Sequence, residues 1–338
     1  MTMYCCRLVL AAMVLVSLTV GCAPRESTPS AEEQTPEATE VAVTTEDELL
    51  TRGRYLVEGP MHCYACHSEI DWAEPGPGQP LPGKKGIGAK FPDVSVPGLV
   101  VASNITPDPE TGIGEWTDEE LGRAIREGVG RDGRRLFPVM PYLFYRSLSD
   151  EDLAAVITYI RSIEPVRNQP PATELPEPVL ASLPPHQAIT EPVPTPDRSD
   201  PIAYGAYLTQ IGECIECHTP MTPQGQPMTE LTLAGGRILE GPWGRVAAAN
   251  LTPDPSGIPY YTRELFIEMM RTGFVSAREL NHVMLWGYYR NMTDEDLEAI
   301  FAYLGTLEPL SHRVSNTESP TPCPLCGQNH GLGDQNSN

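Results

Sequence analysis

Two short stretches of the chain combine two cysteines, two residues apart, with a histidine directly after the second. They are Cys63, Cys66 and His67 in "CYACH", and Cys214, Cys217 and His218 in "CIECH". Two thiols one helical turn apart can form thioethers to both vinyl groups of one haem, and the adjacent imidazole can bind its iron. A disulfide or a redox-active cysteine pair would leave the histidine unused. Two chance copies have odds of about 10⁻⁵, so the motifs predict two covalently bound c-type haems.

A haem iron held by one histidine needs a sixth ligand or stays open for chemistry. Met140 follows His67 by 73 residues, and Met284 follows His218 by 66 residues. A thioether is a soft ligand that closes the iron and favours electron transfer over reaction with oxygen species. The alternative is that each methionine only fills a gap in the core. His282, two residues before Met284, is a competing ligand for the second haem.

An internal repeat sets the domain organisation. Residues 138–165 match residues 282–309 without gaps at an offset of 144, and "NITPDP" (104–109) corresponds to "NLTPDP" (250–255). The order of parts is the same in both halves, which indicates a tandem duplication of a unit of ordinary domain size. We therefore expect domain 1 at residues 47–165 and domain 2 at residues 201–310.

The elements that must position these motifs read as helices, and the predicted fold class is all-α. Opening helices are expected at about 46–57 and 202–209. The closing helix of the first half begins at Ser149 with Asp152 three residues later, a start typical of a capping box. Thr293 and Asp296 repeat it in the second half. Both closing helices carry one apolar face with helical spacing: Leu153, Val156, Ile157 and Ile160 in the first, and Leu297, Ile300, Phe301 and Leu304 in the second.

The N-terminus reads as a targeting segment. Leu8–Val20 is an apolar run of 13 residues, too short for an ordinary membrane span. It ends at Gly21-Cys22, which resembles a bacterial lipoprotein cleavage site. Residues 1–21 are thus predicted to be a lipoprotein signal peptide and Cys22 the lipidated first residue. A plain secretory signal with an incidental cysteine is the alternative, and either places the mature chain outside the cytoplasm.

The remaining segments differ in composition from the two repeats. An acidic tether is expected at residues 22–46, a Pro-rich linker at 166–200, and a disordered C-terminal tail at 311–338. The chain has 45 acidic and 23 basic residues, a formal net charge of −22. This charge argues against nucleic acid as a partner and favours basic or metal-bearing proteins.

The quoted motifs carry a resemblance to a known family. Each half resembles a class I cytochrome c domain, and the pair resembles the haem-carrying subunits that partner bacterial membrane-bound alcohol and sugar-acid dehydrogenases. The resemblance rests on "CYACH", "NITPDPETGIGEWTDEEL", "GRRLFPVMPY" and "LSDEDLAAVITYI" and on weaker counterparts in the second half. It implies a small helical fold around each haem, electron transfer, and the axial pairs His67–Met140 and His218–Met284. The second half departs from it where Leu285 replaces the proline after the methionine.

Two further features leave alternatives open. Trp116, Tyr261, Asn104 and Asn250 either line the haem or close the loops around "NITPDP" and "NLTPDP". Near the C-terminus, Cys323 and Cys326 form a third pair, but Gly327 replaces the histidine that haem attachment requires. A local disulfide is the expected state in an oxidising compartment. A metal site would have His330 as a third ligand, with no fourth ligand evident in the sequence.

The sequence therefore predicts a dihaem cytochrome c in the cell envelope, anchored by lipid on the periplasmic side of the membrane. It would transfer single electrons between redox partners, such as a dehydrogenase, a soluble cytochrome or an oxidase, without enzymatic activity of its own. The competing prediction is a dihaem cytochrome c peroxidase. That enzyme needs one haem without a strong sixth ligand, which two methionines at equivalent repeat positions argue against.

Overall fold

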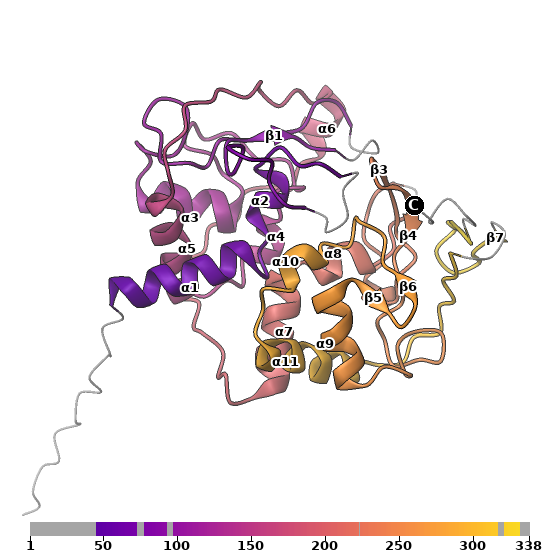
Figure 1. Ribbon diagram of the computed structural model, residues 1–338. Coiled ribbons are helices and arrows are strands. Elements are labelled where there is room, and N and C mark those ends of the chain that lie inside the picture. The colour runs from indigo at the N-terminus through magenta and orange to yellow at the C-terminus, as the bar shows by residue number, and fades with distance from the viewer. Residues whose placement is uncertain (1–44, 73–77, 93–96, 223, 317–320, 332–338) are drawn as a thin grey trace, which may run out of the picture. The chain divides into compact units, whose positions relative to one another are not determined.

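A computed structural model describes residues 45–72, 78–92, 97–222, 224–316 and 321–331 (Figure 1). The predicted signal peptide, Cys22 and nearly all of the acidic tether lie outside these residues. Helices are the main regular structure of the described part. Its α-helices are α1 Glu46–Glu58, α2 Cys63–Cys66, α3 Asp118–Glu127, α4 Tyr142–Tyr145, α5 Asp150–Ser162, α6 Glu177–Ser182, α7 Pro201–Ile211, α8 Cys214–His218, α9 Arg263–Thr272, α10 Trp286–Tyr289 and α11 Asp294–Gly305.

The all-α prediction misses a set of short antiparallel strand pairs. Each pair is formed by consecutive strands of two to four residues. Such strands are too short to show the alternation of apolar and polar residues that identifies a strand in a sequence. The pairs are β1 Ala89–Lys90 with β2 Val101–Ala102, β3 Ile238–Gly241 with β4 Gly244–Ala247, β5 Phe274–Val275 with β6 Arg278–Glu279, and β7 Thr321–Pro322 with β8 Asn329–His330.

The order of helices in the first half recurs in the second, as the repeat predicts. Helices α1 to α5 correspond to α7 to α11, with α6 in the Pro-rich segment between them. The predicted caps are confirmed, since the Ser149 hydroxyl accepts a hydrogen bond from the Asp152 amide and Thr293 does the same for Asp296. The predicted apolar faces of α5 and α11 are also confirmed, because all their residues except the partly buried Phe301 lie in the core.

The opening and closing helices of each half cross at a glycine. A Cβ atom on Gly53 in α1 would lie 1.9 Å from the carbonyl oxygen of Ala155 in α5. A Cβ atom on Gly205 in α7 would lie at the same distance from the carbonyl oxygen of Ala299 in α11. Only glycine allows the backbones to approach this closely, so the two helix pairs pack in the same way.

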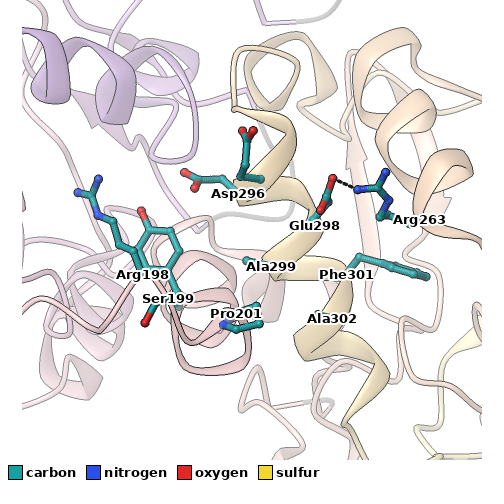
Figure 2. A pocket seen from close by; sticks show the side chains of 11 residues that line it. Arg198, Ser199, Pro201, Arg263, Asp296, Glu298, Ala299, Phe301 and Ala302 are labelled. Carbon is teal, nitrogen blue, oxygen red and sulfur yellow. Dashed lines mark hydrogen bonds and ion pairs between the residues drawn. The ribbon is translucent and has the colours of Figure 1, made fainter.

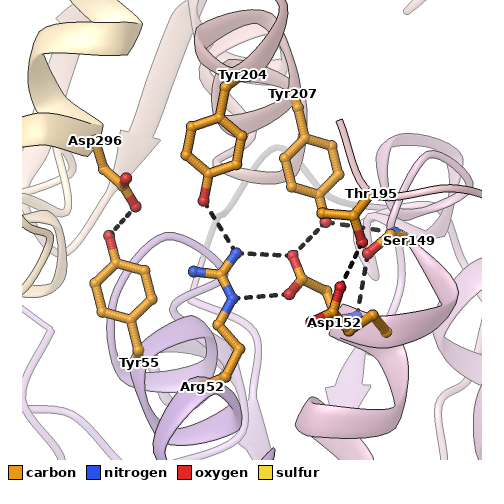
Figure 3. A network of polar contacts seen from close by, with 9 residues as sticks. Arg52, Tyr55, Ser149, Asp152, Thr195, Tyr204, Tyr207 and Asp296 are labelled. Carbon is orange, nitrogen blue, oxygen red and sulfur yellow. Dashed lines mark hydrogen bonds and ion pairs between the residues drawn. The ribbon is translucent and has the colours of Figure 1, made fainter. Parts of the chain in front are cut away.

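The two halves contact each other through reciprocal bonds, which Figure 3 shows. Tyr207 in α7 donates a hydrogen bond of 2.6 Å to Asp152 at the start of α5. Tyr55 in α1 donates the equivalent bond to Asp296 at the start of α11. Each tyrosine comes from the opening helix of one half and each carboxylate from the closing helix of the other. This reciprocity is typical of a two-fold arrangement, formed here within one chain.

The Pro-rich segment lies along the first half in an extended conformation. The amide of Leu99 donates to the Glu174 carbonyl at 2.8 Å, and Glu174 donates back to Leu99 at 2.7 Å. Further along, Arg135 donates to the carbonyl oxygen of Leu183 at 2.7 Å. Hydrogen bonds to its backbone therefore hold this segment in place although it contains little regular structure.

The prediction of a disordered C-terminal tail is wrong for its described parts. Residues 311–316 and 321–331 include the β7–β8 hairpin and the buried side chains of His312 and His330. Composition gave no sign of this order because the tail is polar and lacks a run of apolar residues. Among the described helices, none has the length and apolar composition needed to cross a membrane.

Candidate functional site

Each Cys-x-x-Cys-His motif contains one short helix, and the residue before each helix has a left-handed backbone conformation. His62 precedes α2 with φ 34°, and Glu213 precedes α8 with φ 57°. Left-handed conformations are uncommon outside glycine and are found where surrounding structure enforces them. The equivalent backbone path means that each half presents its two cysteines from one helical turn, as the predicted attachment to a haem requires.

The two motif histidines are oriented by equivalent hydrogen bonds. His67 donates from Nδ1 to the carbonyl oxygen of Ser103 at 2.7 Å, and His218 donates from Nδ1 to that of Ala249, also at 2.7 Å. Burial lowers the pKa of both imidazoles, which keeps them neutral. Since Nδ1 carries the proton, Nε2 keeps its lone pair. A neutral imidazole fixed in this way is the usual form of a metal-binding histidine.

Burial keeps the thiols of Cys63, Cys66 and Cys214 neutral. Burial, with a smaller contribution from the carboxylate of Glu213, raises the pKa of Cys63 to about 12 and that of Cys66 further. Burial also raises the pKa of Cys214 to about 12. None of the six cysteines within the described residues forms a disulfide. Raised pKa values disfavour the thiolate that redox-active cysteine pairs need.

The two predicted methionine ligands lie in loops with matching backbone geometry. The amide of Met140 donates to the Phe137 carbonyl at 3.0 Å, and that of Met284 donates to Asn281 at 3.0 Å. Both side chains are partly buried against the core. Pro141 has φ −82° and ψ 42°, and Leu285 at the equivalent position has φ −74° and ψ 42°. The loop of Met284 therefore keeps its shape without the proline.

His282, the competing ligand, has other contacts. Its Nδ1 lies 3.3 Å from the carbonyl oxygen of Trp72 in the first half, and its Nε2 lies 3.8 Å from Glu279. The side chain is buried. Both ring nitrogens thus face protein oxygens, which gives His282 a role in holding the two halves together.

The asparagines of the repeated "N-x-T-P-D-P" loops close these loops. Asn104 accepts from the Thr106 amide at 2.9 Å and donates to the carbonyl oxygen of Val166 at 2.8 Å. Asn250 makes the same two bonds with Thr252 and Leu310, each at 2.8 Å. Of the two alternatives for these asparagines, the structure supports loop closure. Trp116 and Tyr261 both pack partly buried against the core.

The two motifs are brought together where the halves meet. Tyr145 donates to the carbonyl oxygen of Met61, just before the first motif, at 3.0 Å. It also contacts the Glu213 carboxylate, just before the second motif, at 2.5 Å. His62 lies 3.5 Å from the same carboxylate. Residues adjoining both motifs therefore share one buried polar cluster, which places the two predicted haem attachment sites near each other.

Sequence reasoning missed two features of the candidate site. They are the carbonyl groups of Ser103 and Ala249, and the cluster of Tyr145 and Glu213. A backbone acceptor leaves no trace in the residue type. The tyrosine had a signal, since Tyr145 and Tyr289 match at the repeat offset, and Tyr289 donates to the Gly212 carbonyl at 2.8 Å. Its partner could not be identified before the motif loops were placed.

A surface pocket lies elsewhere on the molecule, at the starts of α7 and α11 (Figure 2). Its lining includes Arg198, Pro201 and Glu295, together with Arg263 and Glu298, which form an ion pair. None of the eight predicted haem-binding residues lines this pocket. It is therefore separate from the site described above.

Comparison with known proteins identifies homologues of the chain. No protein-family profile matches the chain. It is 33% identical over 284 residues to a nicotinate dehydrogenase subunit of Pseudomonas putida, an alignment covering 80% of this chain and 22% of that protein. It is 30% identical to the gluconate 2-dehydrogenase cytochrome c subunit of Pantoea cypripedii, covering 77% and 60%. It is 29% identical to a "Diheme cytochrome c-type" protein of Cereibacter sphaeroides, covering 61% and 71%.

Most of these relatives are longer than the aligned region. The chain spans 52–60% of the dehydrogenase cytochrome subunits it matches. Those subunits belong to alcohol, gluconate and fructose dehydrogenases. At about 30% identity over most of its length, the chain is a homologue of cytochrome c subunits of dehydrogenases and of a dihaem cytochrome c.

Proposed function

We propose that the chain is a dihaem c-type cytochrome that relays single electrons for a dehydrogenase on the periplasmic side of a bacterial membrane. The observation that carries this proposal is the paired geometry of the two motifs. Each combines two cysteines on one helical turn with a neutral histidine whose Nδ1 donates to a backbone carbonyl at 2.7 Å. The dehydrogenase cytochrome subunits among its relatives support the same role.

The donor sets of the two halves fit c-type haem. Cys63 and Cys66 would attach the first haem, and Cys214 and Cys217 the second. Nε2 of the neighbouring histidine is available as one axial ligand in each half, and the thioether of Met140 or Met284 would supply the other. When bound, such a haem supplies a reversible one-electron iron couple. Residues 47–165 and 201–310 would each form one cytochrome domain.

The residues around the motifs favour electron transfer over substrate chemistry. The Ser103 and Ala249 carbonyls fix the imidazoles, so little rearrangement is needed when the charge of the site changes. The contact between the halves brings the two motifs together through Tyr145 and Glu213. A short path between the two haems would let one electron enter through one half and leave through the other.

The partners follow from the relatives and from the charge. Relatives are named as subunits of alcohol, gluconate and fructose dehydrogenases, so a dehydrogenase is the proposed electron donor. A soluble cytochrome or an oxidase would accept the electrons. The net charge of −22 suits a basic partner surface. Lipid on Cys22 would hold the protein at the membrane. The relatives give no support to the peroxidase alternative.

The decisive experiment counts haems and measures their ligation in the purified full-length protein. Two covalent haems should remain after denaturation. Changing Cys66 and His67 to Ala should remove one and leave the other with its absorption spectrum unchanged. One haem or three in the native protein would refute the proposal. Mass spectrometry of the intact N-terminus tests the anchor separately, since an unmodified terminus at another residue excludes lipid on Cys22.

A further inference from the structure

Four side chains outside the haem motifs converge at the C-terminal end of the described chain. They are His312, Cys323, Cys326 and His330, and one ligand atom from each lies within 4.8 Å of all the others. Nε2 of His312 lies 3.2 Å from Sγ of Cys323, and Nε2 of His330 lies 3.3 Å from Sγ of Cys326. Three of the four are buried, and Cys323 is partly exposed.

Both imidazoles are oriented as metal ligands are. His312 donates from Nδ1 to the carbonyl oxygen of Ala234 at 3.1 Å, and His330 donates from Nδ1 to that of Arg313 at 3.1 Å. These bonds leave both Nε2 lone pairs directed at the two sulfurs. A carbonyl acceptor on the ring nitrogen that does not bind the metal is a usual arrangement of a metal-binding histidine.

The two cysteines lie in a tight turn suited to binding one ion. The amide of Cys323 donates to the Gln328 carbonyl at 2.8 Å, and Gly327 donates to the Cys323 carbonyl at 3.0 Å. Gly327 has φ 70°, a conformation that glycine adopts without strain. β7 and β8 continue from this turn as an antiparallel hairpin that carries His330. The turn thus presents both thiols on one side.

The dimensions of the cluster fit tetrahedral zinc. Zinc binds sulfur at about 2.3 Å and imidazole nitrogen at about 2.0 Å, so a tetrahedral site separates S and N by roughly 3.5 Å. The two measured separations, 3.2 and 3.3 Å, are slightly shorter and need only a small expansion. We propose that His312, Cys323, Cys326 and His330 form a closed structural Zn²⁺ site. The ion would replace the two thiol protons, which pass to solvent.

This proposal departs from the disulfide expected from the sequence. Sequence reasoning offered His330 as a third ligand and found no fourth. His312 supplies it from a position 11 residues before Cys323. A disulfide would remove both thiol protons and leave the two buried imidazole lone pairs without a hydrogen-bond donor. Buried acceptors without a partner are costly, so the two histidines favour the ion.

The first half of the chain has an asparagine at the position equivalent to His312. Asn168 is the repeat equivalent of His312, and it donates from Nδ2 to the carbonyl oxygen of Ile87 at 2.8 Å. His312 makes the equivalent bond to Ala234 through Nδ1. The second half has therefore kept this bond while adding a ligand atom at Nε2.

The site would stabilise the environment of the second motif. Ala234 precedes Gly235, whose amide donates to the carbonyl oxygen of His218 at 2.7 Å. Gly236 follows, and a Cβ atom there would lie only 2.5 Å from Cε1 of His312. A zinc ion bound to His312 would therefore fix the loop behind His218 and attach the C-terminal hairpin to it.

The first test is the metal content of the full-length, haem-loaded protein purified without a histidine tag. We expect about one zinc for every two haem irons. X-ray absorption at the zinc edge should report two sulfur and two nitrogen neighbours. Zinc-free protein with a Cys323–Cys326 disulfide, detected by mass spectrometry after alkylation under denaturing conditions, would overturn the proposal, as would another metal at that occupancy.

The second test uses variants whose haem content is measured alongside zinc. His312→Asn recreates the residue of the first half, so it should keep the bond to Ala234 and both haems while zinc content falls at least about tenfold. Cys326→Ser should do the same. Leu325→Ser changes an exposed side chain in the same turn and should retain zinc. Full zinc occupancy in the His312→Asn variant would refute the four-ligand site.

Discussion

At the scale of single residues, the proposed second haem has two candidate sixth ligands that lie two positions apart in the sequence. The loop of Met284 has the same backbone geometry as the loop of its counterpart Met140. The ring nitrogens of His282, by contrast, face Trp72 and Glu279. We therefore predict that Met284→Ala removes the sulfur-to-iron absorption band of the ferric second haem and lowers its potential, because a thioether raises the potential relative to imidazole. Absorption spectra and redox titration measure both effects.

The control for this prediction is His282→Ala. That variant should keep the sulfur-to-iron band, while the contact between the halves weakens through loss of the bond to Trp72. The assignment is wrong if His282→Ala changes the ligand spectrum of the second haem and Met284→Ala leaves it unchanged.

Asp152 and Asp296 occupy equivalent positions, but Asp152 makes more side-chain contacts, so we expect its loss to reduce stability more. Asp152 is fully buried and accepts from Arg52 at 2.7 and 2.8 Å as well as from Tyr207. We predict that Asp152→Ala costs about 3–5 kcal/mol of stability, because Arg52 is left with its charge uncompensated. Asp296→Ala, which loses the bond to Tyr55, should cost about 1 kcal/mol. Urea unfolding followed by circular dichroism compares them, and equal losses would contradict the prediction.

At the scale of elements, the crossings of α1 with α5 and of α7 with α11 depend on Gly53 and Gly205. An alanine at either position would place Cβ 1.9 Å from a carbonyl oxygen of the facing helix. We predict that Gly53→Ala and Gly205→Ala each destabilise the protein by about 2–3 kcal/mol, although alanine favours an unconstrained helix by about 1 kcal/mol. Thermal unfolding of the haem-loaded protein measures the change.

Gly305→Ala is the matched control for the helix crossings. Gly305 is the last residue of α11, and a Cβ atom there would have no neighbour within 4 Å. Its substitution should change stability by no more than about 0.5 kcal/mol. If Gly53→Ala is tolerated equally well, the close approach of α1 and α5 is not required for folding.

The elements that could be predicted from the sequence are those specified by residues close together in the chain. The caps at Ser149 and Thr293 and the apolar faces of α5 and α11 depend on residues within a few positions of one another, and the structure contains them. The two-residue strands had no local pattern to detect. His312 illustrates the other kind of failure. It lies in a polar tail without any neighbouring motif, because its partners are brought to it by a turn and a hairpin that only the folded chain reveals.

At the scale of the whole molecule, the repeat explains how the two halves meet. Equivalent residues on each side, such as Tyr55 and Tyr207, make the same bond to the other half. The symmetry is incomplete next to the motifs, where His62 in the first half corresponds to Glu213 in the second. An ion pair replaces what would otherwise be two identical side chains facing each other. The duplicated halves have therefore diverged at the position where they adjoin.

We predict that this divergence makes the contact between the halves depend on pH. His62 is buried, and burial alone would lower its pKa, but Glu213 at 3.5 Å and a hydrogen bond to the Pro60 carbonyl outweigh it and raise the pKa above its usual value. A raised folded-state pKa means that the pair stabilises the protein fully below the unfolded value and loses this effect as pH rises through the folded value. Stability should therefore fall as pH rises above about 6.5, the ordinary pKa of a histidine.

The variant Glu213→Gln isolates the charge in this pair. The glutamine amide has nearly the same shape as the carboxylate and can still contact the Tyr145 hydroxyl, while the attraction that raises the pKa of His62 is removed. We predict that its urea midpoint, measured at intervals from about pH 6 to about pH 9, falls less steeply than that of the native protein. Glu216→Gln in α8, the helix that Glu213 precedes, loses a partly exposed ion pair with Arg237 and should keep the native slope. Equal slopes in Glu213→Gln and the native protein would show that His62 does not titrate through this pair.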